Sequence, residues 1–222
     1  MSSRYSPSTV LDDLSSIEVL ASPCSSSSKT ADSRERYQYA SCYSEENVFK
    51  MCAARRWSDE EGFAIFVGNA TSTVSFKHHV KNPSGTVVWD YHVFYLSKPR
   101  GSSSFEVRDQ DSSLSFPSAC ATYATKTFPS STGTLSSKHL PPLFRVVPAS
   151  EYLSSFSSDR SHMVKSIGSD KAVTYCYPVP SWAAIRSGAQ TNNLATKFYL
   201  SANEGGAGVV MDLEEFTSHF CT

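Results

Sequence analysis

The part of the chain that most restricts its fold is the run from Val87 to Leu96, which is apolar at almost every position. A strand that is apolar on both sides belongs in the centre of a sheet that is covered on both faces. Further strands are predicted over 63–67, 74–80, 105–111, 144–147 and 208–211. A helix is predicted over 45–57, where Val48 and Met51 follow helical spacing. Two more helices are predicted, over 149–156 and 213–220. Strands that cluster after an initial helix predict an α+β domain, with a mostly antiparallel sheet flanked by helices.

The first 36 residues differ from the rest of the chain. They are rich in serine, include the run Ser25–Ser28, and have Tyr5 as their one aromatic residue. Such a segment buries too little apolar surface to offset the entropy that ordering it would cost. We therefore expect a serine-rich tail over 1–36, with room for one short helix over 10–21, and a single folded domain over 37–222.

Composition excludes several classes of function. The net charge of −1 leaves no basic surplus for binding nucleic acid. No stretch approaches the length of about 18 apolar residues that suggests a membrane helix, and the N-terminus lacks a secretory signal. The six cysteines form no CxxC pair, so neither a metal site nor a disulfide framework is expected. We expect a cytoplasmic or nuclear protein with reduced thiols.

A histidine and an acid come together if the strands 87–96 and 105–111 form a hairpin. With a two-residue turn at Arg100–Gly101, His92 falls directly opposite Asp109. A carboxylate in that place can accept the imidazole N–H, fix its tautomer and stabilise the imidazolium. Two alternatives stay open, namely that His92 is a hydrogen-bonded core residue and that Asp109 is a surface charge. Asp111 competes for the same role.

A candidate nucleophile lies at the start of the helix predicted over 45–57. Cys42 and Ser44 both lie near the helix N-terminus, where the macrodipole and the unpaired backbone N–H groups favour negative charge. Serine at this place is most often a helix cap. Chemistry alone therefore favours Cys42, because a thiolate is available near neutral pH and an alkoxide is not.

Several motifs in this chain resemble one family of hydrolases. Residues 41–47 read SCYSEEN, and they resemble the SCYCEEN active-site segment of the protein N-terminal glutamine amidohydrolases. The WDYHV motif of that family recurs at 89–93, and its DLD…FP segment resembles 109–117. Further matches occur at 144–146, 158–163 and 208–216. The resemblance covers about 37–220, and it moves the expected nucleophile from Cys42 to Ser44.

The resemblance implies a transglutaminase-like or papain-like cysteine hydrolase fold and a defined reaction. These enzymes hydrolyse the side-chain amide of an N-terminal glutamine to glutamate and ammonia, without a cofactor, as an early step of the N-degron pathway. Position 44 would be the nucleophile, His92 the base and then the acid, and Asp109 the residue that orients His92. The partners expected are the N-terminal glutamine of protein substrates and other N-degron enzymes. The candidate substrate-binding residues are Cys42, Tyr43, Glu45, Trp89 and Asp90, of which Glu45 and Asp90 could accept the α-amino group.

Position 44 departs from the family pattern, because it carries serine where the family has its nucleophilic cysteine. We expect an engineered, inactivating replacement of cysteine by serine. A natural serine in a working enzyme is one alternative, and a natural non-catalytic relative that binds N-terminal glutamine is another. A transglutaminase-like or peptidase-like acyl transfer on internal residues is the rival activity.

Overall fold

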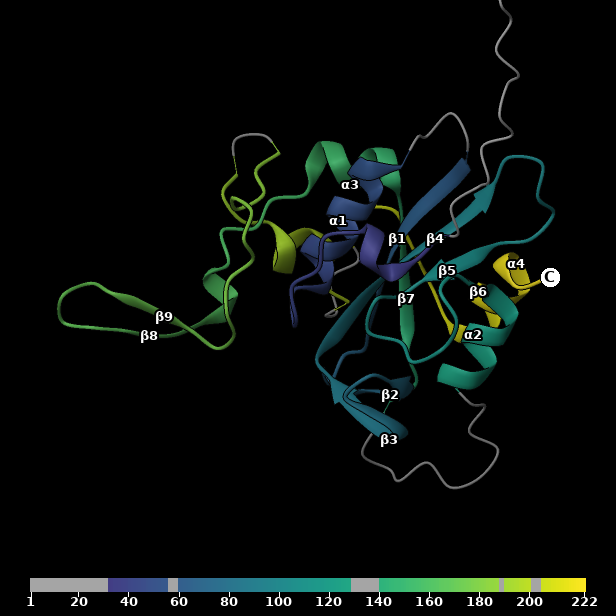
Figure 1. Ribbon diagram of the computed structural model, residues 1–222, viewed down its shortest axis with the longest axis horizontal. Coiled ribbons are helices and arrows are strands. Elements are labelled where there is room, and N and C mark those ends of the chain that lie inside the picture. Colours follow the sequence, from purple (N-terminus) through teal and green to yellow (C-terminus); the bar gives the residue numbers. More distant parts are fainter. Residues whose placement is uncertain (1–31, 56–59, 129–139, 188–189, 201–204) are drawn as a thin grey trace, which may run out of the picture. The chain divides into compact units, whose positions relative to one another are not determined.

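A six-stranded antiparallel sheet organises the chain in the computed structural model, which describes residues 32–55, 60–128, 140–187, 190–200 and 205–222. The strand order is β10-β7-β1-β4-β5-β6 (Figure 1). The strands are β1 (Glu60–Gly68), β4 (Tyr91–Pro99), β5 (Glu106–Arg108), β6 (Ser118–Ala119), β7 (Leu143–Pro148) and β10 (Val209–Met211). Two small sheets pair β2 (Val74–His79) with β3 (Asn82–Trp89), and β8 (Val164–Ile167) with β9 (Val173–Tyr175).

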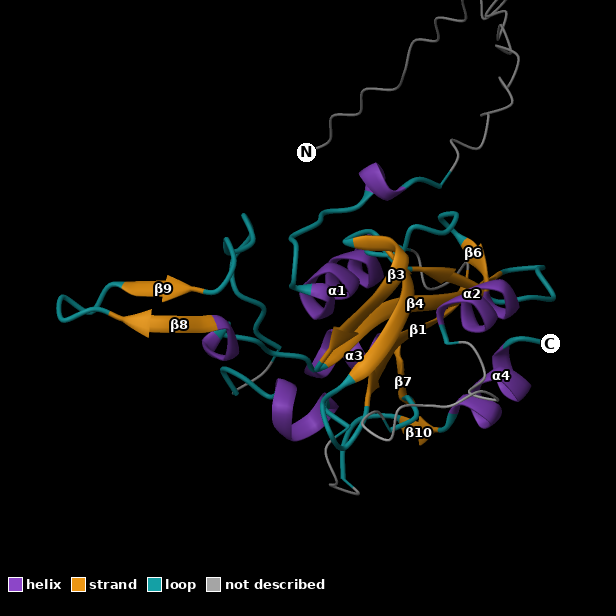
Figure 2. Ribbon diagram, turned by 90° about the horizontal axis from the view of Figure 1, so that it is seen from below, coloured by secondary structure: helices purple, strands orange, loops and turns teal. Residues whose placement is uncertain are grey.

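Helices cover both faces of the main sheet (Figures 1 and 2). On one face lie α1 (Ser44–Ala54) and α3 (Ala149–Ser155), and on the other α2 (Cys120–Thr127) and α4 (Leu213–Phe220). Short helical turns occur at Arg34–Arg36, Ser161–Met163 and Leu194–Phe198. Strand alternation sends Phe66 toward α1 and α3, and its neighbour Val67 toward α2 and α4. The expected α+β class, with an antiparallel sheet flanked by helices in the manner of transglutaminase-like folds, is confirmed.

The predicted strand 87–96 is in fact two strands of different sheets. β3 ends at Trp89, and β4 begins at Tyr91. The carboxylate of Asp90 accepts the backbone N–H of Tyr91 at 3.0 Å, a local bond that competes with the ladder of a continuous strand. The prediction of a central buried strand is therefore right for β4 and wrong for the residues before it, since β3 is mostly exposed.

The hairpin register also differs from the prediction. Leu96, rather than Phe94, lies opposite Val107, so the pairing is shifted by two residues. The chain does turn at Arg100–Gly101, where Gly101 has a φ of 82°. The loop then continues to Phe105 before β5 begins, and this extra length moves the register. A shift of two residues preserves the alternation of side chains, so His92 and Asp109 stay on the same side of the sheet.

Several elements were not predicted from the sequence, namely β6, the part of β3 before Val87, the three short helical turns, the helix α2 and the hairpin β8–β9. The helix α2 contains three threonines in eight residues and gives only a weak apolar pattern. The hairpin β8–β9 consists mostly of exposed residues, so it lacks a buried face that alternation could reveal. The other predicted helices and strands are confirmed, with shifts of a few residues at their ends.

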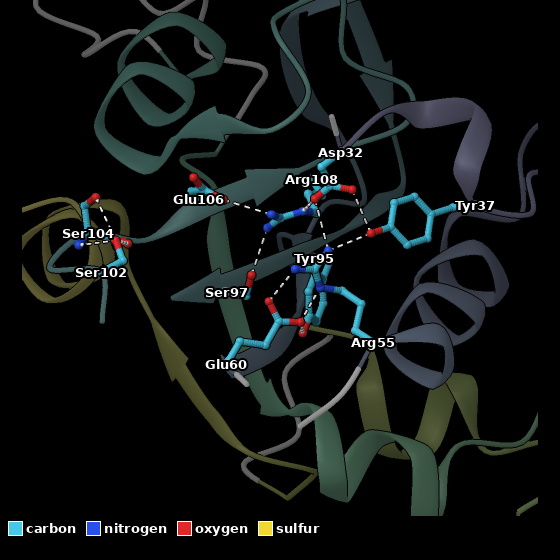
Figure 3. A network of polar contacts seen from close by, with 10 residues as sticks. All are labelled: Asp32, Tyr37, Arg55, Glu60, Tyr95, Ser97, Ser102, Ser104, Glu106 and Arg108. Carbon is cyan, nitrogen blue, oxygen red and sulfur yellow. Dashed lines mark hydrogen bonds and ion pairs between the residues drawn. The ribbon is translucent and has the colours of Figure 1, made fainter. Parts of the chain in front are cut away.

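Residues 32–36, which the sequence assigns to the tail, contact the folded part of the chain. The Asp32 carboxylate accepts hydrogen bonds from Arg108 at 2.6 Å, from Arg55 at 3.1 Å and from the Tyr37 hydroxyl at 2.8 Å (Figure 3). The tail boundary at residue 36 stays a prediction, and the helix expected over 10–21 lies outside the described residues. Among the described helices, none is both long and apolar enough to cross a lipid bilayer.

Candidate active site

Ser44 is the first residue of α1, and its hydroxyl is not a helix cap. Tyr43 occupies the N-cap position, and no side chain caps the helix there. The Ser44 Oγ instead accepts the backbone N–H of Val93 at 3.2 Å, directly beside His92 in the chain. Negative charge at this atom would be favoured by that N–H and by the positive end of the helix. The site therefore suits a nucleophile.

The three residues after Ser44 are buried and fix the first turn of α1. The Asn47 side chain bonds both the N–H and the C=O of Ala40, at 2.8 and 2.9 Å. Both oxygens of Glu46 accept hydrogen bonds from Arg160 at 2.8 Å, and one also accepts the Trp182 indole N–H at 2.7 Å. These contacts explain why an acid stands at position 46 and an amide at position 47.

His92 and Asp109 form a buried pair. His92 is 3 % exposed and Asp109 6 %, and Nε2 of the histidine lies 3.0 Å from Oδ1 of the acid. Asp109 also accepts the Tyr123 hydroxyl at 2.7 Å and the Asp111 backbone N–H at 2.9 Å. Because Nε2–H donates to Asp109, Nδ1 is the nitrogen left to exchange a proton with a nucleophile.

Burial and charge act against each other at this pair. Burial disfavours the charged form of each group, but the attraction between the two outweighs it. The carboxylate of Asp109 therefore raises the pKa of His92, with help from Asp111 and Glu45. In turn, the charge of His92 and the hydrogen bonds to Asp109 lower the pKa of that acid. The geometry favours an imidazolium–carboxylate pair.

The competing acid, Asp111, has a different partner. Its Oδ1 accepts the Tyr39 hydroxyl at 2.6 Å, so it supports the turn that carries Asp109. Ligand atoms of His92, Asp109 and Asp111 do lie within 4.8 Å of one another, which a metal ion could exploit. Both oxygens of Asp109 already accept hydrogen bonds from protein donors. Those bonds account for the cluster without an ion.

Glu45 follows the nucleophile position in the sequence, and one of its carboxylate oxygens makes no hydrogen bond with a described residue. It is fully buried, and its Oε2 accepts the Tyr91 hydroxyl at 3.0 Å. Its Oε1 makes no hydrogen bond with any described residue, although Nε2 of His162 lies 3.4 Å away. A buried carboxylate oxygen without a donor is costly unless a ligand supplies one. Glu45 can therefore accept an ammonium group.

The other predicted substrate-binding residues have different surroundings. Cys42 has a φ of 68°, and its Sγ lies 3.0 Å from the Lys81 ammonium, which also lies over the Trp89 ring at 4.5 Å. Tyr43 is fully buried, and burial raises its pKa to about 12. Asp90 is exposed and accepts the backbone N–H of Tyr91 at the start of β4. No described contact joins it to Ser44, His92 or Asp109.

Sequence reasoning missed several residues that support the site. Tyr123 could not be found, because the helix that carries it was not predicted. Arg160 lies in the matched segment 158–163, to which no role was assigned. The feature that could have pointed to it is Glu46, since a buried acid needs a cationic partner. His79 gives no signal in the sequence beyond its place directly after His78. In the structure it packs 6.1 Å from His92, measured between ring centroids.

The antiparallel sheet carries a buried His92–Asp109 pair and places Ser44, at a helix N-terminus, next to the strand of His92, an arrangement compatible with a hydrolase that works by acyl transfer. The sequence model of a family described as N-terminal glutamine amidase matches residues 39–220. The chain belongs to this family, whose curated members are named as amidohydrolases, that is, hydrolases acting on amides.

Relatives named protein N-terminal glutamine amidohydrolase occur in several fruit flies. The one from Drosophila willistoni is 38 % identical over 188 residues, which cover 82 % of this chain and 87 % of the relative. The one from Drosophila mojavensis is 37 % identical over the same length and with the same coverage.

Proposed function

We propose that the site is built to hydrolyse the side-chain amide of an N-terminal glutamine to glutamate and ammonia, and that Ser44 is an inactivating replacement for a nucleophilic cysteine. The observation that carries the proposal is the hydrogen bond between His92 and Asp109, next to the start of α1. Membership of the amidase family supplies the substrate.

The chemistry follows with cysteine at position 44. Nδ1 of His92 takes the thiol proton, and the sulfur attacks the side-chain amide carbon. The tetrahedral intermediate collapses as His92 returns the proton to the leaving nitrogen, so ammonia departs and a thioester remains. Water then attacks the thioester with His92 as base, releasing glutamate and the thiol. Asp109 orients the imidazole and stabilises its charged form.

The electrostatics of His92 are compatible with sulfur at position 44. Asp109 raises the pKa of His92, which favours the charged ring that a thiolate–imidazolium pair uses. Serine hydrolases use the same histidine–carboxylate pair, so the preference for cysteine over serine at position 44 rests on the family pattern.

We propose Glu45 as the acceptor of the substrate's α-ammonium group. Its buried Oε1 makes no hydrogen bond with a described residue and has His162 Nε2 at 3.4 Å, whereas the carboxylate of Asp90 is exposed and already accepts the N–H of Tyr91. The charge of an N-terminal ammonium would neutralise Glu45 in a place that water does not reach. An acetylated N-terminus lacks this charge, so the enzyme would act on free N-termini.

The family resemblance also supports a place for the reaction. A new N-terminal glutamate can be arginylated, so we propose that the protein acts at the start of the N-degron pathway, in the cytoplasm or nucleus. A reporter protein that begins with glutamine tests this, because it should persist longer in cells that lack the active form of this protein.

The test of the activity is the variant Ser44→Cys. We expect it to release ammonia from peptides that begin with glutamine, and the Ser44 form to be at least about 100-fold slower. Peptides that begin with asparagine or acetyl-glutamine, or carry glutamine inside, should not react. A chelator should leave the rate unchanged, since no step uses a metal.

Other outcomes would support the rival hypotheses about the activity. Turnover of the acetylated or internal-glutamine peptides by Ser44→Cys would support transglutaminase-like or peptidase-like chemistry. Binding of glutamine-starting peptides by a folded Ser44→Cys protein, with no ammonia released, would support a non-catalytic relative.

A further inference from the structure

A second buried histidine, His79, reaches the triad because the end of β2 is irregular. The pairing of β2 with β3 shifts its register between Lys77 and His79, and His78 has a φ of 56°. Bulges of this kind re-aim a side chain and recur beside active sites. His79 is 3 % exposed, and its ring lies edge-on to that of His92 with 6.1 Å between centroids.

The end of β2 is also attached to the turn that carries the triad acid. The backbone C=O of His78 accepts the Ser113 N–H at 2.6 Å, and the Val80 N–H donates to the Asp111 C=O at 2.8 Å. His79 itself forms a β-bridge with Ser112. The backbone of His79 is therefore held next to the turn that carries Asp109.

The hydrogen bond at Nδ1 favours the uncharged form of His79, although its buried Nε2 has no partner among the described residues. Its Nδ1 accepts the backbone N–H of Lys81 at 3.1 Å, so the neutral ring carries its proton on Nε2. A second proton would have to enter at Nδ1, where it would point at the Lys81 N–H, one donor facing another. Charge on His79 therefore breaks this bond and loosens the turn that holds Lys81 against Cys42 and Trp89.

The charges around His79 lead to the same form. It faces His92 on β4, Lys81 in the turn after β2, and the acids Asp109 and Asp111 after β5. Burial first and the charge of His92 second lower the pKa of His79, and the two acids only partly compensate. Two charged rings at this distance repel each other in a site from which water is excluded.

We propose that His79 is a positioning residue that acts through His92. Uncharged His79 holds the His92 ring and the turn at Lys81 in place, and protonation of His79 at acid pH inactivates the site. The proposal rests on the catalytic role proposed for His92. It gives the enzyme an acid limit set by a residue that touches neither substrate nor nucleophile.

The first test follows the histidine rings by nitrogen NMR in the chain as it stands, and it needs no turnover. From pH 8 downward, His79 should remain the Nε2–H tautomer until after His92 is charged. In His92→Asn the repulsion is gone, so His79 should take its proton at a pH higher by about one unit. A midpoint for His79 that is unchanged by His92→Asn would overturn the proposal.

The second test measures the pH profile of ammonia release in the Ser44→Cys background. His79→Asn keeps an acceptor for the Lys81 N–H but cannot be charged, so its acid limb should move to lower pH and lose steepness. His79→Phe keeps a ring but loses the acceptor, and its rate should fall at every pH. His78→Asn is the matched control, because asparagine tolerates the positive φ at this position, and it should keep the original profile.

An acid limb that is the same in His79→Asn and in the parent would also overturn the proposal. If Ser44→Cys proves inactive, the proposed function fails while the NMR titration still decides whether His79 and His92 are coupled. If one His79 variant does not fold, the other variant and the His92→Asn titration still give a result.

Discussion

At the scale of single residues, the site depends on how a buried carboxylate is stabilised. Asp109 accepts hydrogen bonds from His92, from the Tyr123 hydroxyl and from the Asp111 backbone. An ion in this environment is stable only when its lone pairs are used. Tyr123 is the one side-chain donor among these that takes no direct part in the proposed proton transfers.

Removing the Tyr123 hydroxyl should weaken both the fold and the reaction. We expect Tyr123→Phe to lower the free energy of unfolding by about 1.5–3 kcal/mol, because a charged acceptor loses a donor. It should also reduce the rate of ammonia release in the Ser44→Cys background, since Asp109 is then held less well. Urea unfolding at pH 7 and a rate measurement check the two effects.

Tyr95→Phe is the matched control for that variant. The Tyr95 hydroxyl donates to Glu60 at 2.8 Å in the network of Figure 3, which includes neither His92 nor Asp109. It should lower stability by a comparable amount and leave the rate unchanged. Equal losses of rate in the two variants would show that Tyr123 acts only through overall stability.

At the scale of elements, the first turn of α1 is held by a loop from far along the chain. Arg160 reaches Glu46 from the segment between α3 and β8, and the same segment brings His162 to Glu45. Arg160 itself has a φ of 64°, a conformation that few residues other than glycine and asparagine adopt readily. The buried ion pair thus aligns the nucleophile position with the acid proposed to bind the substrate.

Breaking this ion pair should be costly. We expect Arg160→Ala to lower the free energy of unfolding by about 3–5 kcal/mol, because Glu46 is left as an uncompensated buried charge. Lys98→Ala is the control, since Lys98 pairs with Glu61 at the surface, and it should cost at most about 1 kcal/mol. Urea unfolding of both variants decides, and similar costs would contradict this account.

The elements also show how far sequence patterns reach. Alternation correctly placed His92 and Asp109 on one side of the sheet, although the predicted hairpin register was wrong by two residues. A shift by an even number of residues keeps each side chain on the same face of the sheet. The length of the loop after Arg100–Gly101 could not be predicted from the sequence. The break at Asp90 was missed because it depends on one side chain bonding its neighbour's N–H.

At the scale of the whole molecule, the helices that cover both faces of the sheet help to exclude water from His92 and Asp109. His92 lies on the central strand β4 and is almost completely buried. Its pKa, raised by Asp109, therefore links protonation of the site to the stability of the entire fold.

The pH dependence of stability should report this link. A raised folded pKa contributes stability below the unfolded value of about 6.5, and that contribution disappears as pH rises through the folded pKa. The stability advantage of the parent chain over His92→Asn should therefore shrink as pH rises above about 6.5. It should do so by about 1.4 kcal/mol for each unit of pKa shift.

Urea unfolding of the two proteins at several pH values measures the difference. His219→Asn, at an exposed position of α4, is the control for replacing a histidine by asparagine as such, and the loss of stability with pH is read relative to it. An advantage of the parent over His92→Asn that grew with pH would mean that Asp109 does not stabilise a charged His92.

The sequence by itself determined the class of fold, most of the helices and strands, and the motifs that place the chain among the N-terminal glutamine amidases. Those features depend on the periodicity of apolar residues and on short runs of residue types, which a chain carries locally. Tertiary structure alone decided how His92 and Asp109 are buried and bonded, that Oε1 of Glu45 makes no hydrogen bond with a described residue, and that His79 packs against His92. Each of these depends on contacts between segments far apart in the chain, on burial and on one irregular strand end, and none of them leaves a local pattern in the sequence.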